Sequence, residues 1–205
     1  MDNNKKKNVL LNVTKEFNED SNLIGKTITL GYNNESDLPI EWEVIAKNDE
    51  YVLVLSKYIL KQIPFSLKLH QDDYNMYHDG LIREYLSKEF IKFFSNQELD
   101  LIESFGKDKF YILSSDDLIR YFNIDYKSEN LNLRAKPEPS LYSNGFETNE
   151  SGYGKYWLKS FDSKHDYAQI IDSFGNITRA KINNPTIGIR VCCWIKRKNE
   201  KKYIE

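Results

Sequence analysis

Tyr156-Trp157-Leu158-Lys159-Ser160 and, further along the chain, Gly188-Ile189-Arg190 are the stretches that decide the fold. Short apolar segments separated by turn residues surround them. We expect strands near 155–160, 167–172, 177–182 and 187–196, with a turn at 173–176. Both stretches therefore belong to strands, and we expect them to meet in one sheet. They indicate an architecture but identify no reaction.

The composition is that of an ordinary globular domain. The chain has 205 residues, of which 40% are hydrophobic and 14% aromatic, so it can bury a real core. Its net charge of −2 predicts no general attraction to nucleic acid or to an anionic membrane. No apolar run approaches the length that spans a bilayer. We therefore expect neither a membrane nor nucleic acid in general as a partner.

The sequence predicts one domain with two extended ends. Residues 1–22 are rich in Asn, Lys, Glu and Asp and predict a flexible arm, and residues 197–205 predict a basic tail. Residues 23–196 between them predict a single domain. Within it, residues 123–154 lack clear periodicity and carry many Gly, Pro, Ser and Asn residues, which predicts a long irregular loop. Such a loop inside a compact domain is usually functional or mobile.

The cysteines and the N-terminal sequence indicate a reducing compartment. Cys192 and Cys193 are adjacent, so in a strand they point to opposite faces and cannot easily bridge each other. The apolar run Val9-Leu10-Leu11 is too short for a signal peptide. We expect a cytoplasmic protein.

The first part of the domain predicts a meander of three strands. Residues 27–30 and 40–45 alternate polar and apolar side chains, as half-buried strands do. Residues 51–55 are apolar throughout, which favours a central strand, and a turn at 47–50 precedes it. A further short strand is expected at 110–113.

The middle of the chain predicts helices with recognisable N-caps. Asp79 is a candidate cap for the first helix. The apolar face of that helix would carry Ile82, Tyr85, Leu86, Phe90 and Phe93. Ser95 and Glu98 fit a capping box that begins a second helix, and Gly106 is expected to end it. Ser114-Ser115-Asp116-Asp117 offers a third cap.

Six short motifs, taken in order, resemble an uncharacterised bacterial and phage domain family, the domain of unknown function 6273. They are Trp42-Glu43-Val44-Ile45, Leu53-Val54-Leu55-Ser56-Lys57, residues 82–90, Tyr111-Ile112-Leu113-Ser114, Tyr156-Trp157-Leu158-Lys159-Ser160 and Gly188-Ile189-Arg190. The resemblance runs from about residue 25 to 196. The last two motifs are also similar to those of C-type-lectin-like folds of the formylglycine-generating-enzyme type.

This resemblance implies an α+β fold. The expected architecture is a C-type-lectin-like single domain with antiparallel or mixed short-stranded sheets, two to three helices and long irregular loops that present a binding surface. The chain departs from the family at Lys159, where Arg is usual, at Phe161, where Pro is frequent, and at Val191-Cys192, where Pro-Ala is usual. These departures concern any ligand tied to those positions, whereas the fold inference survives them.

The metal chemistry of this fold group is not expected here. The copper-binding enzyme among such folds uses two cysteines several residues apart, a spacing that Cys192 and Cys193 lack. Calcium-dependent lectins use Glu-Pro-Asn and Trp-Asn-Asp motifs. Glu138-Pro139-Ser140 lacks the Asn ligand, and Trp157-Leu158-Lys159 puts a cation where calcium needs oxygen. We assign no catalytic residue, no metal and no cofactor.

Each histidine nevertheless has a carboxylate nearby, which keeps an enzyme open as an alternative. The pairs are His70 with Asp72 and Asp73, His78 with Asp79, and His165 with Asp166. A carboxylate can orient and charge an imidazole for acid–base or metal chemistry. Such adjacency is also common by chance in polar loops. The alternative function is a small His/Asp-dependent hydrolase or metal-binding enzyme.

Five residues are assigned to the scaffold. They are Trp42, Trp157, Gly188, Arg190 and Trp194. We expect Trp157 to anchor the core. Arg190, beside Trp194, is expected to stack and to bridge backbone carbonyls or a carboxylate.

The loop region carries the candidate binding residues. They are Tyr142, Asn144, Phe146, Tyr153 and Tyr156. Aromatic rings among small polar residues are typical of recognition surfaces on rigid scaffolds, although a connector whose rings pack onto the domain has the same composition. We expect a non-catalytic recognition domain that binds another protein through residues 123–156, in a setting that the resemblance makes phage, mobile-element or defence. A structural subunit of a larger assembly is the third alternative, and the oligomeric state is left open.

Overall fold

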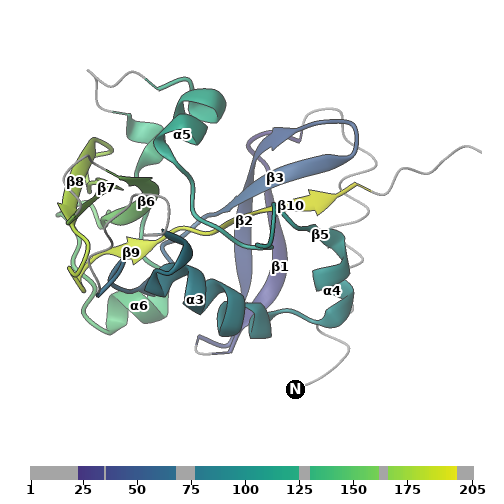
Figure 1. The fold of residues 1–205 in the computed structure, drawn as a ribbon, viewed down its shortest axis with the longest axis horizontal. Coiled ribbons are helices and arrows are strands. Elements are labelled where there is room, and N and C mark those ends of the chain that lie inside the picture. Colours follow the sequence, from purple (N-terminus) through teal and green to yellow (C-terminus); the bar gives the residue numbers. More distant parts are fainter. Residues whose placement is uncertain (1–22, 35, 68–76, 125–129, 162–165, 198–205) are drawn as a thin grey trace, which may run out of the picture.

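Two five-stranded sheets lie side by side, with helices packed around and between them (Figure 1). The computed structural model describes residues 23–34, 36–67, 77–124, 130–161 and 166–197. The predicted arm at 1–22 and all but the first residue of the predicted tail at 197–205 lie outside these residues. The mixture of helices and sheets confirms the α+β class.

The strands are short and divided equally between the sheets. The first sheet has the order β1-β2-β3-β10-β5, with β1 (Thr27–Asn33), β2 (Leu38–Lys47), β3 (Tyr51–Ser56), β10 (Cys192–Lys196) and β5 (Ile102–Glu103). The second has the order β4-β9-β6-β7-β8, with β4 (Lys61–Gln62), β9 (Gly188–Ile189), β6 (Tyr156–Phe161), β7 (Tyr167–Ile171) and β8 (Ile177–Lys181). The described helices are α3 (Leu81–Lys88), α4 (Asn96–Leu101), α5 (Ser115–Phe122) and α6 (Pro139–Ser143), with 3-10 turns η1 (Phe90–Phe93) and η2 (Leu131–Leu133).

The predicted meander is confirmed. β1, β2 and β3 are antiparallel neighbours in the order in which they occur along the chain. Asn48 closes the turn before β3: its N–H donates to the Tyr51 carbonyl at 2.9 Å, and its Oδ1 accepts from the Tyr51 N–H at 2.7 Å. An Asn side chain that bonds to backbone in this way favours a tight turn.

The prediction of one strand over 187–196 is wrong, because this segment contributes to both sheets. β9 pairs in the second sheet and β10 in the first. The segment from β3 to β4 crosses beside it, since Ser56 N–H donates to the Val191 carbonyl at 2.7 Å and Leu60 N–H to the Ile189 carbonyl at 3.0 Å. The two segments, residues 56–62 and 188–191, form one antiparallel ribbon, which we call the crossing ribbon. It links the two sheets through backbone hydrogen bonds.

The two stretches that opened the sequence analysis do meet. Tyr156 at the start of β6 pairs with Gly188 in the parallel ladder between β6 and β9. The Gly188 N–H donates to the Lys155 carbonyl at 3.0 Å. The expectation of a shared sheet is confirmed for these residues, although Arg190 already lies beyond β9.

The start of α3 differs from the prediction. Its N-cap is Gly80 rather than Asp79, and no side chain caps it. The Leu81 N–H donates instead to the Phe65 carbonyl at 3.2 Å. A contact from a distant segment thus satisfies a donor at this end of the helix, which local sequence rules cannot foresee.

The predicted capping box at Ser95 is confirmed, and the cap predicted at 114–117 is a capping box as well. Ser95 and Glu98 begin α4, and Ser114 and Asp117 begin α5. Glu98 has a second partner, because its Oε1 accepts the N–H of Gly31 on β1 at 2.9 Å while Oε2 accepts the Ser95 N–H at 2.7 Å. This buried carboxylate therefore joins α4 to the first sheet.

The predicted end of α4 at Gly106 is wrong. The helix ends at Leu101, and Ile102 enters β5 at once. Gly106 lies further on, in a turn that is closed by reciprocal backbone bonds between Phe105 and Asp108. Pairing of β5 with β10 takes the backbone away from the helix before a glycine is needed.

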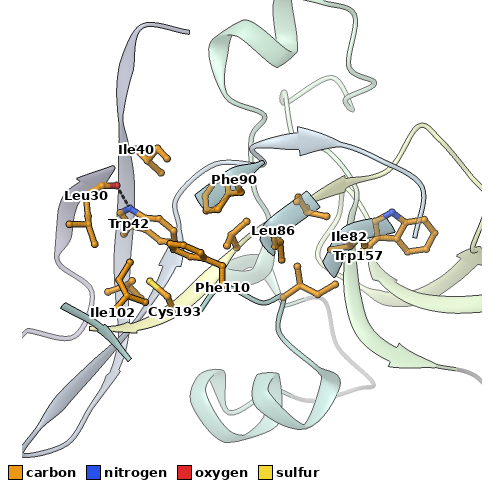
Figure 2. Close-up of a cluster of buried hydrophobic side chains, with 14 of the residues drawn as sticks. Leu30, Ile40, Trp42, Ile82, Leu86, Phe90, Ile102, Phe110, Trp157 and Cys193 are labelled. Carbon is orange, nitrogen blue, oxygen red and sulfur yellow. Dashed lines mark hydrogen bonds between the residues drawn. The ribbon is translucent and has the colours of Figure 1, made fainter. Parts of the chain in front are cut away.

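The larger hydrophobic core connects the two sheets (Figure 2). Trp42 on β2 and Trp157 on β6 lie at its two ends, and neither has exposed surface. Between them lie Ile82, Leu86, Phe90 and Phe110. The indole of Trp42 donates to the Leu30 carbonyl at 2.8 Å and that of Trp157 to the Ile63 carbonyl at 2.9 Å. Both rings thus bury their apolar area without leaving the N–H unpaired.

A second core covers the opposite face of the first sheet, against α5. The alternation along the strands divides neighbouring residues between the two cores. Val54 and Cys193 belong to the larger core, whereas Leu55 and Cys192 belong to the second. The two cysteines are free thiols on opposite faces, as expected.

The expected strand at 110–113 is reduced to a single bridge, which is a correction of the prediction. Tyr111 exchanges two backbone bonds with Cys192 of β10, at 3.1 and 2.7 Å. Two residues later, the Leu113 carbonyl accepts the N–H of Lys159 on β6 at 2.8 Å. The segment divides its hydrogen bonds between the two sheets, so it extends neither.

Candidate functional site

The described part of the predicted loop is held against the scaffold at several points. The Ile59 N–H donates to the Lys136 carbonyl, and the Glu138 N–H to the Ile59 carbonyl, both at 2.9 Å. The Gly154 N–H donates to the Ala135 carbonyl at 2.9 Å. Residues 130–154 are therefore an ordered surface built on the crossing ribbon, with η2 and α6 as its short helical turns. Residues 125–129 lie outside the described chain.

Two of the five candidate binding residues lie inside the domain. Phe146 and Tyr156 are only 4% and 3% exposed, and both belong to the second core. The Tyr156 hydroxyl donates to the Leu133 carbonyl at 2.6 Å, and this bond links the loop to β6. Their side chains are not available to a partner. Sequence alternation alone placed Tyr156 nearer the loops than Trp157, but both faces of β6 are covered.

The other three candidates are accessible but do not form one cluster. Tyr142 on α6 is 57% exposed, and Asn144 at the end of α6 is exposed as well. Tyr153 is half-buried and contacts a different set of residues. Among the described rings, Tyr142 and Tyr153 make no contact with each other.

Tyr153 is flanked by two cations. The Arg134 guanidinium lies 4.4 Å from the centre of the ring, and the Lys136 ammonium lies 5.6 Å from it. Arg134 is held in turn, since its Nε donates to the Leu131 carbonyl at 3.3 Å. A cation over the face of a tyrosine is attracted by the ring electrons, so this group is pre-arranged.

The turn between β7 and β8 completes this surface. Phe174 is 55% exposed at its tip, and Asp172 Oδ1 accepts the N–H groups of Phe174 and Asn176 at 2.8 and 2.9 Å. Gly175 has φ +93, and a Cβ there would lie 3.3 Å from Arg134 Cγ. The turn therefore packs beside Arg134.

We define the Tyr153 patch as Leu131, Arg134, Lys136, Tyr153 and Phe174. Asn149 links the loop to the turn between β7 and β8. The Asn149 Nδ2 donates to the Ser173 carbonyl at 2.8 Å, and the Asn149 Oδ1 accepts the Tyr153 N–H at 3.0 Å. Sequence reasoning missed Leu131, Arg134 and Phe174. A large ring in the middle of the predicted turn at 173–176 was the signal for Phe174, since turns are exposed.

Arg190 lies in the crossing ribbon and is 3% exposed. Its Nε donates to the Ser56 carbonyl at 2.8 Å, and its Nη2 donates to Glu43 Oε2 at 3.1 Å. The carbonyl and the carboxylate match the expected kinds of partner. The neighbouring ring, however, is Tyr156 at 5.6 Å from the guanidinium. Burial raises the pKa of Tyr156, and Arg190 acts in the opposite direction.

The profile of one protein family, described as Domain of unknown function (DUF6273), matches residues 49–197 of this chain. That is well over half of its length. The chain belongs to the DUF6273 family. The match begins after β2, so the motif at Trp42 lies outside it. Searches of curated proteins and of solved structures found no match.

In this DUF6273 chain the structure describes the surroundings of one of the three histidines, His78. His70 and His165 lie outside the described residues. His78 lines a cleft together with Asp108 and Arg83. The described part of the chain contains no group of three or more His, Cys, Asp or Glu residues that could hold a metal ion. Among the same residues, no helix is both long and apolar enough to cross a membrane.

Proposed function

We propose that this DUF6273 domain is a non-catalytic recognition domain that binds another protein, and that the Tyr153 patch is the centre of its binding surface. The observation that carries the proposal is the accessible Tyr153 ring held between Arg134 and Lys136 on an anchored loop. Tyr and Arg are among the residue types most enriched where binding energy concentrates in protein interfaces. A ring that is already positioned loses little entropy when a partner covers it.

The chemistry of the patch defines the kind of partner. Leu131 and Phe174 expose 53% and 55% of their surface, so a partner must bring apolar side chains to cover them. Arg134 and Lys136 add two positive charges next to the rings. We expect a protein partner whose contact surface combines apolar residues with Asp or Glu. Tyr142 and Asn144 contribute only if the partner extends as far as α6.

The wider setting is part of the same proposal. The long loop held over short-stranded sheets supports a C-type-lectin-like arrangement. The free cysteines support a cytoplasmic location, and resemblance to bacterial and phage proteins supports a role in a phage, mobile element or defence system. Comparison of the strand order and connections of both sheets with those of lectin-like folds tests the first expectation, and a different topology would contradict it. Fractionation of source cells tests the second, since recovery outside the cytoplasm would contradict it.

The test compares patch variants with matched surface variants. Tagged wild-type chain is used to capture proteins from source-cell lysate, and each captured protein is quantified by mass spectrometry. Tyr153→Ala with Phe174→Ala should lower capture of the partner by at least about tenfold. Tyr142→Ala tests the extension to α6. Ile119→Ala on α5, where the residue is 45% exposed, should leave capture unchanged.

Two results would contradict the proposal. One is a wild-type chain that captures no protein above the untagged control. The other is equal capture by the Tyr153 and Phe174 double variant, with thermal unfolding showing that it is folded. Light scattering over a range of concentrations adds a separate outcome: self-association that the double variant abolishes would replace the foreign partner with a second copy of this chain.

A further inference from the structure

A second site lies away from the Tyr153 patch, in a cleft of about 490 Å³ where the two sheets meet. Phe105 and Lys107 come from the turn after β5, Tyr111 from the bridge to β10, and Lys159 from β6. Arg83 of α3 forms part of the lining. The volume falls within the range of about 300–1,000 Å³ that is typical of small-molecule sites, which often form where structural units meet.

The charges that line the cleft are unbalanced. Arg83 Nε lies 2.9 Å from each carboxylate oxygen of Asp108, so these two charges neutralise each other. Arg83 also donates from Nη1 to the His78 carbonyl at 3.0 Å, which holds it in place. Lys107 and Lys159 remain, and neither has a carboxylate partner in the part of the chain that the structure describes. Within the described ranges, two ammonium groups therefore line the cleft without a carboxylate counter-charge.

Lys159 is positioned rather than loose. Its ammonium lies 4.7 Å from the centre of the Tyr77 ring, and its backbone N–H is bonded to Leu113. Tyr77 is buried, and burial raises the pKa of its hydroxyl, so the ring stays neutral. The contact with the neutral ring fixes the position of the Lys159 ammonium without neutralising its charge, so the ammonium can still bind an anion.

Aromatic surface lies beside these cations. Phe105 is 65% exposed, which is unusual for so large an apolar ring. It packs on Tyr111 with ring centres 5.7 Å apart and an angle of 33° between the planes. The outer face of such a pair offers a platform for another planar ring. Burial raises the pKa of Tyr111, so its hydroxyl stays protonated.

We infer that this cleft binds a nucleoside phosphate, with the base stacked on Phe105 and the phosphates bound by Lys107 and Lys159. A flat ring next to two unpaired cations matches a ligand that is aromatic at one end and anionic at the other. Stacking on an aromatic side chain accepts any base, because every base has a π face. Lysine binds phosphate as a point charge, which needs no fixed fork of donors.

Calorimetric titration of the full chain with ATP, inorganic triphosphate and adenosine separates the two halves of the site. ATP should bind at least about tenfold more tightly than either fragment, since each fragment makes only half of the contacts. Lys159→Gln and Lys107→Gln should each weaken ATP by about tenfold, which corresponds to about 1.4 kcal/mol. Phe105→Ala should weaken ATP by a similar factor and leave inorganic triphosphate unchanged.

Two controls accompany these variants. Lys155→Gln removes an exposed cation outside the cleft and should not alter ATP binding. Phe105 is largely exposed, so Phe105→Ala is expected to fold even if Lys159→Gln loses stability through Tyr77. Thermal unfolding of every variant shows which of them are folded.

The inference fails if ATP does not bind saturably, or if inorganic triphosphate binds as tightly as ATP. It also fails if Phe105→Ala binds ATP as the wild type does, or if Lys155→Gln loses as much affinity as Lys159→Gln. A phosphotyrosine peptide that binds more tightly than ATP and competes with it would assign the cleft to a peptide instead. Because the cleft and the Tyr153 patch share no residue, either proposal can fail without the other.

Discussion

Arg190 donates its Nε to the carbonyl of Ser56 at 2.8 Å, at the point where both segments of the crossing ribbon pass from one sheet to the other. Ser56 is fully buried, and its hydroxyl accepts the Val191 N–H at 3.0 Å and donates to the Tyr58 carbonyl at 2.9 Å. Backbone groups that leave a ladder need other partners, because a buried unpaired group is costly. Here one arginine and one serine supply them.

Replacing Arg190 should therefore destabilise the domain as a whole. Arg190→Met leaves the Ser56 carbonyl without this donor and should lower the free energy of unfolding by about 1–3 kcal/mol, as measured in urea. Arg190→Lys keeps the charge but loses the planar guanidinium that reaches Ser56 and Glu43 together. Its free energy of unfolding should therefore lie between those of the wild type and of Arg190→Met. Glu43→Gln should cost less than about 1 kcal/mol, since Glu43 is 41% exposed. An Arg190→Met protein as stable as the wild type would contradict this assignment.

Gly188 is required for steric reasons. A Cβ at this position would lie 2.2 Å from Ile59 Cγ2 and 3.1 Å from the Lys61 carbonyl oxygen. Gly188→Ala should cost about 1–3 kcal/mol, which is typical of overpacking a core. Ile59→Ala removes the clashing methyl group and is itself destabilising, so the double variant should lose less than the sum of the two single losses. Simple additivity in thermal or urea unfolding would count against a clash between these residues.

Glu98 and Asp117 allow a matched comparison of two capping boxes. Asp117→Ala should cost about 1 kcal/mol, the usual value for a lost cap. Glu98→Ala should cost about 2–3 kcal/mol, because it also leaves the buried Gly31 N–H without an acceptor. Glu98→Gln keeps one carbonyl oxygen, so its loss of stability should lie between those of Asp117→Ala and Glu98→Ala. Equal losses for the two alanine variants would show that the bond to β1 adds nothing.

The domain should lose stability at alkaline pH. Burial raises the pKa values of Tyr77, Tyr111, Cys192 and Cys193 above their ordinary values, which are 10.0 for tyrosine and 9.0 for cysteine. The folded chain keeps these protons while the unfolded chain releases them, so the stabilising contribution is complete below about pH 9 and declines as the pH rises further. Each group contributes a slope of at most about 1.4 kcal/mol per pH unit.

Urea unfolding at pH 7, 9 and 10 measures this decline, and phenolate absorbance provides an independent signal. The buried tyrosines should ionise only as the chain unfolds. Tyr111→Phe should reduce the slope, because it removes one of the titrating groups. Complete phenolate formation in a chain that still has its native circular dichroism spectrum would contradict the prediction.

Local features were predictable because their causes are local. The capping boxes depend on residues three positions apart, and the opposite faces of Cys192 and Cys193 follow from the geometry of any strand. The meander likewise follows from alternation and from one turn at Asn48. The same rules failed at Gly80 and at Leu101, where a contact from Phe65 and pairing with β10 decided the boundary.

The burial of the candidate binding residues was not predictable from the sequence. Phe146 and Tyr156 are core residues, and Arg134 and Phe174 were not among the candidates. Composition identifies which segment carries rings, whereas burial depends on what packs on both sides of each ring. Asn149 and Gly175 bring the loop and the turn together, and no pattern within either segment indicates that contact.

The sequence by itself determined the α+β class, the family, most strand positions and two helix starts, because alternation and capping act over a few residues. Only the tertiary structure decided that the last strand divides between two sheets, that Arg190 joins them at Ser56, and which rings remain exposed. These outcomes depend on backbone bonds and side-chain contacts between residues more than a hundred positions apart, such as Ser56 and Arg190.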